Sequence, residues 1–162
     1  MRSGAPDLIL SNQRINKPTK KDIMRSYAID SSHAAGRILA LTMVVDGNLA
    51  HSELVALDRT RILKYVTLDH GAFQQLLQEL CDDLLSGAVH GVVQFDACLI
   101  DGLLTEIEHP DLRRHLLQAM WNIADADGWL ADGEAVLLTR AGVMWGAETG
   151  FRTRGLLPAS HY

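Results

Sequence analysis

Two short acidic segments contain the residues of this sequence that could hold a ligand. The first reads DGNLAHSE over residues 46–53, and the second reads DGWLADGE over residues 127–134. Aspartate, glycine, leucine, alanine and glutamate fall at the same positions in both. Closely spaced carboxylates are ligands for hard cations such as Ca²⁺ and Mg²⁺. Both segments are therefore candidate cation sites.

The second segment is the better candidate. Residues 123–134 align with a twelve-residue calcium loop, which places Asp125, Asp127 and Glu134 at loop positions 3, 5 and 12. Ile123 stands at the first position, where such a loop carries a carboxylate. The sequence thus predicts at most a weakly bound divalent cation on Asp125, Asp127 and Glu134.

The first segment is a poorer candidate, because Thr42 and Val44 occupy loop positions 1 and 3. Asp46 and Glu53 are its remaining potential ligands. His51 could join them at a transition-metal site, although no paired zinc spacing occurs among the histidines.

A purely structural interpretation of both segments remains open. Each glycine would take a positive φ just past a helix end. Leu49 and Leu130 would anchor the turns in the core, and Glu53 and Glu134 would favour the dipole of the following helix. No ligand is needed in this interpretation, which the sequence favours over a cation site in both segments and most clearly in the first.

No motif of enzymatic chemistry accompanies these acids. The sequence lacks HExxH, GxSxG, Walker and Rossmann patterns. Paired carboxylates could serve general acid–base catalysis, but no partner groups are recognisable. We expect a protein that is not an enzyme.

Amphipathic helices should position the two segments. Ser31 or Ser32, Asp69 and Asp111 are predicted helix caps. Apolar residues recur at helical spacing over about residues 31–46, 50–59, 69–86, 92–108, 111–127 and 132–145, whereas residues 60–68 suit a helix or an extended piece. The prediction is an all-α, compact bundle of six to seven helices with an internally duplicated helix-turn-helix unit.

The 162 residues divide into three predicted parts. Residues 1–30 form a loosely ordered basic arm, residues 31–146 the helical domain, and residues 147–162 a C-terminal tail. Between residues 66 and 134 there are thirteen acidic residues against two basic ones. This acidic surface argues against nucleic-acid binding, which depends on neutralising phosphates, whereas the basic arm leaves peripheral membrane contact open.

Composition and cysteine content predict the location. Hydrophobic residues make up 48% of the chain, but no apolar run is long enough to span a bilayer, and no secretory signal is evident at the N-terminus. Two cysteines are too few for a disulfide scaffold. We expect a cytoplasmic protein without a transmembrane segment.

Two stretches resemble a known family. The pattern ADADGxLxxxE over residues 124–134, preceded by DLRRxLL over residues 111–117, resembles the TerB-like family of tellurite-resistance proteins. The similarity covers about residues 31–146, and the first segment departs from the pattern at Val44 and Val45. The resemblance implies a duplicated all-helical fold, a link to tellurite and general stress resistance, and a metal suggested at the acidic motif.

Two functions are therefore considered. The leading hypothesis is a non-enzymatic TerB-like stress-resistance protein that acts through protein–protein contacts on an acidic helical surface. The alternative is a divalent-cation sensor that uses the acidic loop at residues 125–134.

Overall fold

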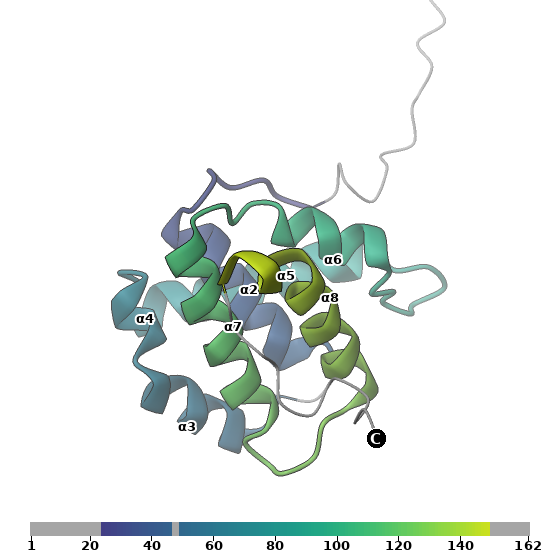
Figure 1. The fold of residues 1–162 in the computed structure, drawn as a ribbon. Coiled ribbons are helices and arrows are strands. Elements are labelled where there is room, and N and C mark those ends of the chain that lie inside the picture. The colour runs from purple at the N-terminus through teal and green to yellow at the C-terminus, as the bar shows by residue number, and fades with distance from the viewer. Residues whose placement is uncertain (1–23, 47–48, 150–162) are drawn as a thin grey trace, which may run out of the picture.

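Helices account for nearly all of the regular structure in the computed structural model, which describes residues 24–46 and 49–149 (Figure 1). In chain order these are α2 (Ser32–Val44), α3 (His51–Thr60), α4 (Ile62–Tyr65), α5 (His70–Ser86), α6 (Ala97–Leu104), α7 (Pro110–Ala124) and α8 (Asp132–Thr149). The described part also contains one isolated bridge, between Val89 and Val92. The predicted all-α fold is confirmed, and the internal duplication stays a prediction.

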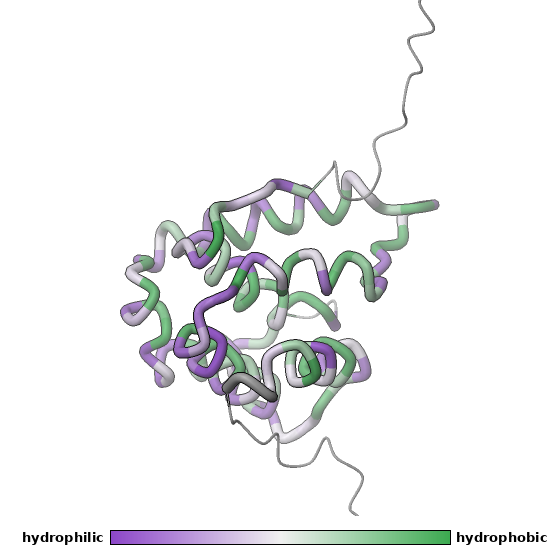
Figure 2. The backbone as a smooth tube through the Cα atoms, turned by 45° about the horizontal axis from the view of Figure 1, so that its top comes forward, coloured by the Kyte–Doolittle hydropathy of each residue, from purple (hydrophilic) through white to green (hydrophobic). Residues whose placement is uncertain are grey.

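Helix α2 forms the centre of the core. Its residues from Ala34 to Met43 are all buried, and it packs against α5 and α7. Gly36 permits the close approach to α5, because a Cβ atom there would lie 2.7 Å from Leu76 Cδ1. The more exposed helices alternate between hydrophobic and hydrophilic residues along the chain (Figure 2). Their apolar faces complete a single core around α2.

Two of the predicted caps are confirmed. Ser31 Oγ accepts a hydrogen bond from the Ala34 N–H at 3.1 Å, and Asp69 Oδ1 accepts one from the Ala72 N–H at 2.7 Å.

The prediction that Asp111 caps α7 is wrong. Proline at the first helical position starts the helix at Pro110, so that His109 becomes the cap and its Nδ1 accepts from the Asp111 N–H.

The helix predicted over residues 92–108 is also shorter than expected. The chain turns through positive φ at His90 and Gly91, and the helix begins only after Asp96, whose side chain caps it. Upstream of Asp96, Val92 lies in the isolated bridge with Val89, and residues 93–96 form an irregular segment.

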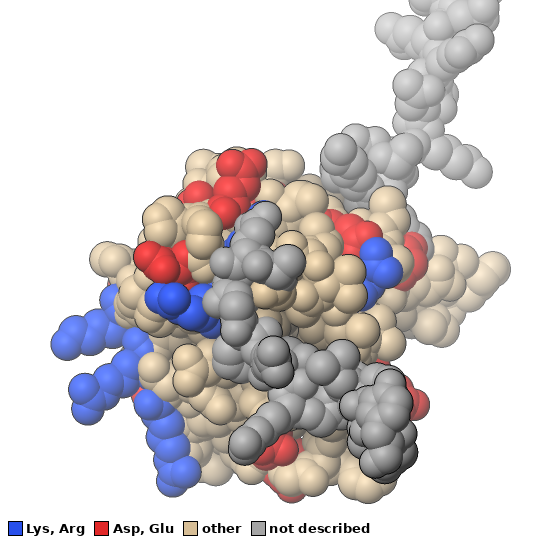
Figure 3. All heavy atoms as spheres, in the orientation of Figure 1, with Lys and Arg blue, Asp and Glu red and all other residues tan. Residues whose placement is uncertain are grey.

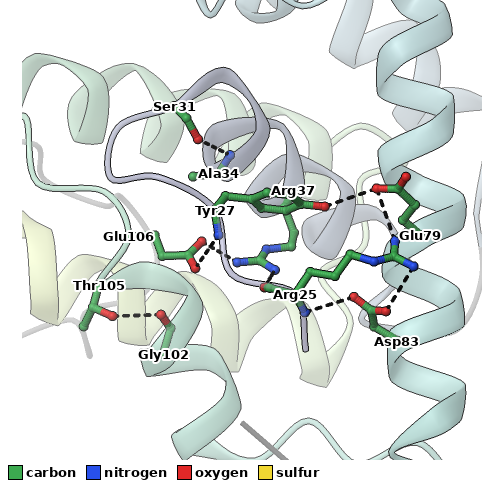
Figure 4. Close-up of polar contacts among 10 residues, drawn as sticks. All are labelled: Arg25, Tyr27, Ser31, Ala34, Arg37, Glu79, Asp83, Gly102, Thr105 and Glu106. Carbon is green, nitrogen blue, oxygen red and sulfur yellow. Dashed lines mark hydrogen bonds and ion pairs between the residues drawn. The ribbon is translucent and has the colours of Figure 1, made fainter. Parts of the chain in front are cut away.

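A buried arginine ties the segment before α2 to the bundle (Figure 4). The Arg37 side chain is 2% exposed, and its guanidinium lies 4.4 Å from the centre of the Tyr27 ring. It donates to the Arg25 carbonyl and to the Glu106 carboxylate. Burial of a guanidinium is tolerated when such partners surround it.

The same segment is anchored to α5 and to the start of α7. Arg25 forms ion pairs with Glu79 and Asp83 at 3.2 and 3.6 Å. Asp30 Oδ1 accepts from the N–H groups of Glu108 and His109. Residues 24–30 thus lie against the bundle, whereas the rest of the predicted arm, 1–23, and the tail residues 150–162 lie outside the described part. Within the described residues, no helix is long and apolar enough to cross a bilayer.

Candidate metal centre

The structure brings the two acidic segments together at one place. Asp46 follows α2, Glu53 lies in the first turn of α3, and Glu134 lies in the first turn of α8. One carboxylate oxygen from each lies within 4.8 Å of the other two. Glu53 and Glu134 are each 2% exposed, whereas Asp46 is exposed. We call these three residues the carboxylate cluster.

Helix capping positions the two glutamates. Glu134 Oε2 accepts a hydrogen bond from the Ala131 N–H at 2.9 Å, and Glu53 accepts one from the Ala50 backbone. Ala50 and Ala131 each directly precede the helix of their glutamate. A glutamate that reaches back in this way satisfies a free N–H at the helix start. The local sequence therefore directs both side chains to equivalent positions in their turns.

Gly133 brings the start of α8 against the residue that follows α2. A Cβ atom on Gly133 would lie 2.8 Å from the Val45 carbonyl oxygen, so only glycine fits without a shift of the backbone. Gly133 adjoins Glu134, and Val45 adjoins Asp46. The contact therefore holds carboxylates from separate parts of the chain beside one another.

The loop between α7 and α8 positions a fourth acid. Gly128 has the predicted positive φ, +75°, and Asp127 Oδ1 accepts from the Trp129 N–H at 2.9 Å. Asp127 is exposed, yet its charge raises the pKa of both Glu53 and Glu134. Asp125 is exposed at the end of α7 and lies outside the carboxylate cluster. The acids of the cluster therefore come from more than one loop.

The two leucines of the segments differ. Leu130 is partly buried against the core, as expected, but Leu49 is 45% exposed, so the prediction that both plug into the core is wrong for Leu49. Trp129 is 75% exposed. Apolar side chains therefore remain at the surface of both acidic segments.

Burial and negative neighbours raise the pKa values of the two glutamates. For Glu53, burial is the largest cause, followed by the charges of Asp46 and Glu134, and the pKa rises to about 7. The pKa of Glu134 is also raised, by burial and by the charges of Asp46 and Asp127, against the hydrogen bond from Ala131. No positive group contributes to either shift. Neutralisation of the cluster thus requires a proton or a cation.

One oxygen in the cluster is unsatisfied. Glu53 Oε2 is buried and has no hydrogen-bond partner within the described structure. An oxygen-only donor set of this kind suits Ca²⁺, Mg²⁺ or Mn²⁺, whereas structural zinc prefers cysteine and histidine. His51 is exposed and is not a member of the cluster. The residues present therefore fit a hard divalent cation.

Comparison with known proteins identifies the family. The model of the family named tellurite resistance protein TerB matches residues 32–148. This chain belongs to the TerB family. The TerB match begins at the first residue of α2 and ends within α8, so it includes the whole carboxylate cluster. No curated protein and no solved structure matches the chain significantly.

The sequence predicted every member of the cluster as a ligand, but it did not predict that the three residues lie at one site. It placed Asp125, Asp127 and Glu134 in one candidate site, and Asp46 and Glu53 in another. The signal for a common site was the shared alanine and glutamate spacing, which gives Glu53 and Glu134 the same capping geometry. The spacing within each segment did not indicate that the two turns pack against each other.

Proposed function

We propose that this TerB-family protein binds one divalent, oxygen-preferring cation between its two Asp-Gly segments. Asp46, Glu53 and Glu134 are its ligands, and Asp127 contributes negative charge beside them. The observation that carries the proposal is the buried, unpartnered Oε2 of Glu53 within a group of carboxylates. This is the cation-sensor alternative with ligands drawn from both segments instead of residues 125–134 alone.

A cation at this position would act on conformation. Burial and the repulsion between the acids raise the pKa of both glutamates, and the charge of the cation would offset these two effects. Its ligands would join the turn after α2 to the first turns of α3 and α8. In the tellurite or general stress response that we infer from the family, the protein would respond to the cation without catalysing a reaction.

Thermal unfolding of the full chain tests the proposal. We expect CaCl₂ or MnCl₂ added after EDTA treatment to raise the Tm of the wild type by a few degrees, because a ligand that binds only the folded state stabilises it. Glu53→Gln keeps a side chain of the same shape and should abolish most of the response. Asp82→Asn, which removes an exposed acid on α5, is the matched control and should respond like the wild type.

The unliganded variants separate loss of binding from loss of folding. Glu53→Gln removes a repelled charge, so its Tm in EDTA should equal or exceed that of the wild type. Equal metal-induced shifts in Glu53→Gln and the wild type, or no shift in the wild type at millimolar metal, would overturn the cation proposal.

A second candidate function, contact with a protein partner, is favoured by Trp129. This side chain is 75% exposed on the loop that carries Asp127, and exposed tryptophan is enriched at binding hot spots. A photo-crosslinking residue in place of Trp129 should give a discrete adduct in cells, whereas the same residue in place of Asp82 should not. Equal labelling at the two positions would rule out a specific contact at the loop.

A further inference from the structure

The unpaired positive charge of the described region gathers on one face of an otherwise acidic molecule. Arg25, Arg37, Arg114 and Arg140 each form an ion pair with an acidic side chain. Arg59, Arg61 and Lys64 are exposed and form no ion pair among the described residues. We call these three residues the basic face.

The basic face lies at the junction of α3 and α4. Arg59 is in the last turn of α3, Arg61 separates the two helices, and Lys64 is in α4. Figure 3 shows basic side chains projecting from the part of the surface where Figure 1 places these helices. The chain as a whole carries a formal net charge of −5, so this concentration of cations runs against its composition.

A groove begins at the basic face and runs between α3 and α7. Its volume is about 460 Å³. Helix α3 contributes Ser52, Val55, Ala56 and Arg59, whereas α7 and the residues after it contribute Asn122 and Ala126. Because the α3 residues recur at helical spacing, one face of the helix supplies an apolar middle with a cation toward one end. We call this hollow the α3–α7 groove.

We propose that the basic face and the α3–α7 groove together dock an acidic peptide segment of a partner protein. Acidic side chains of the peptide would pair with Arg59, Arg61 and Lys64, and an apolar side chain would lie against Val55 and Ala56. The carrying observation is charge complementarity: Arg59 lines a hollow that holds both apolar and hydrogen-bonding groups, and Arg61 and Lys64 follow it closely in the chain. None of the three cations has an ion-pair partner within the described residues. No member of the carboxylate cluster lines the groove, although Ser52 and Ala126 adjoin Glu53 and Asp127 in the chain.

Charge and shape favour a peptide over other anionic partners. Nucleic acid presents a long row of phosphates and would be repelled by the acidic remainder of the surface. A membrane is bound best by an exposed, convex apolar face, whereas the apolar residues here line a hollow. A short acidic segment fits the dimensions of the groove and the number of cations.

Selection from a random dodecapeptide library displayed on phage, on the full chain in EDTA, tests the proposal. We expect enrichment of peptides that combine aspartate or glutamate with an apolar residue. The enriched peptides should bind Arg59→Glu/Arg61→Glu/Lys64→Glu at least about tenfold more weakly, and binding to the wild type should weaken as salt rises. The charge-preserving Arg59→Lys/Arg61→Lys/Lys64→Arg variant should bind within about threefold of the wild type, because it keeps the charge complementarity.

A second variant separates the groove from general electrostatic attraction. Asn122 is exposed, so Asn122→Trp obstructs the α3–α7 groove at little cost to folding and changes no charge. It should also weaken binding at least about tenfold. Circular dichroism and thermal unfolding should show that each variant remains folded.

Three results would overturn the proposal. They are enrichment of peptides without acidic residues, equal binding by the charge-reversed variant, and full binding by Asn122→Trp. Sedimentation with phosphatidylserine vesicles through the same three cations, without acidic-peptide binding, would instead assign the face to a membrane. Because all peptide measurements are made in EDTA, their failure leaves the cation proposal unaffected, and the reverse also holds.

Discussion

The two carboxylate oxygens of Glu53 have different environments. One side of the carboxylate accepts a hydrogen bond from the Ala50 backbone, as a helix cap does, whereas Oε2 is buried without a donor. Helix capping therefore explains the environment of only one of the two oxygens. Burial, together with the negative charges of neighbouring acids, raises the pKa of Glu53 to about 7. This is a cost to the unliganded fold that a cation would reduce.

The first prediction is a pH dependence of stability in the absence of metal. The pKa of Glu53 in the folded chain, about 7, lies above the ordinary value of 4.5. Its stabilising contribution is therefore complete below about pH 4.5 and is lost as the pH rises through about 7. From about pH 5 to pH 8 we expect urea unfolding in EDTA to show a loss of about 1–3 kcal/mol from this group.

The Glu53→Gln variant isolates that contribution. Glutamine does not titrate, so the fall in stability between the two pH values should be smaller in Glu53→Gln than in the wild type. Parallel stability curves for the two proteins would show that the pKa of Glu53 does not differ between the folded and unfolded chains.

At the level of helices, the geometry of the cluster depends on how closely α8 approaches the end of α2. Gly133 faces the Val45 carbonyl, and no side chain fits between them. Within the α7–α8 loop, the Trp129 N–H donates to Asp127 Oδ1 and the Ala131 N–H donates to Glu134 Oε2. Small residues and local turns, and not the acids themselves, thus determine where the acids lie.

The second prediction concerns Gly133→Ala. The added Cβ would lie 2.8 Å from a backbone oxygen that cannot rotate away, so we expect a loss of about 1–3 kcal/mol in unfolding free energy and weaker metal binding. Gly102→Ala in α6 is the matched control, because its Cβ would have no atom within 4 Å. Its stability should rise by up to about 1 kcal/mol. Equal effects of the two substitutions would contradict the role given to the close approach.

Local patterns predicted the helices, whereas tertiary packing decided the site. Ser31 and Asp69 were identified as caps because a cap is a short-range interaction. Pro110 moved the start of α7 ahead of Asp111, and the His90-Gly91 turn shortened the helix predicted around α6. The convergence of Glu53 with Glu134 requires α3 and α8 to pack on α7, and spacing within either segment carries no information about that packing.

At the scale of the whole molecule, the cluster joins distant parts of the chain. Asp46 and Glu53 lie on either side of the turn into α3, whereas Glu134 begins α8. Helix α7 contacts α2, α3 and α8. A change at the cluster would therefore reach both turns at once through α7.

The third prediction is that calcium protects both acidic segments from hydrogen exchange together. Amides of residues 50–54 and 127–134 should exchange several-fold more slowly with the metal than in EDTA, because opening of either turn would break the site. Amides in the middle of α5, away from the cluster, serve as the internal reference. Protection confined to residues 127–134 would instead indicate a single-loop site.

The fourth prediction concerns the contacts before α2. Tyr27 covers the Arg37 guanidinium with its ring and donates its hydroxyl to Glu79. Tyr27→Ala should lower the unfolding free energy by about 2–3 kcal/mol, whereas Tyr27→Phe keeps the ring and should lose about 1 kcal/mol. Chemical denaturation measures both, and equal losses would show that the ring itself contributes nothing.

The contacts of Arg37 extend beyond the residues that match the TerB family. The match to the TerB family starts at residue 32. The buried guanidinium of Arg37 nevertheless contacts the carbonyl of Arg25 and the ring of Tyr27, which precede that residue. A fragment that begins at residue 32 would lack both of these partners of the buried Arg37 guanidinium. We therefore expect a fragment that keeps residues 24–31 to be more stable than one that begins at residue 32.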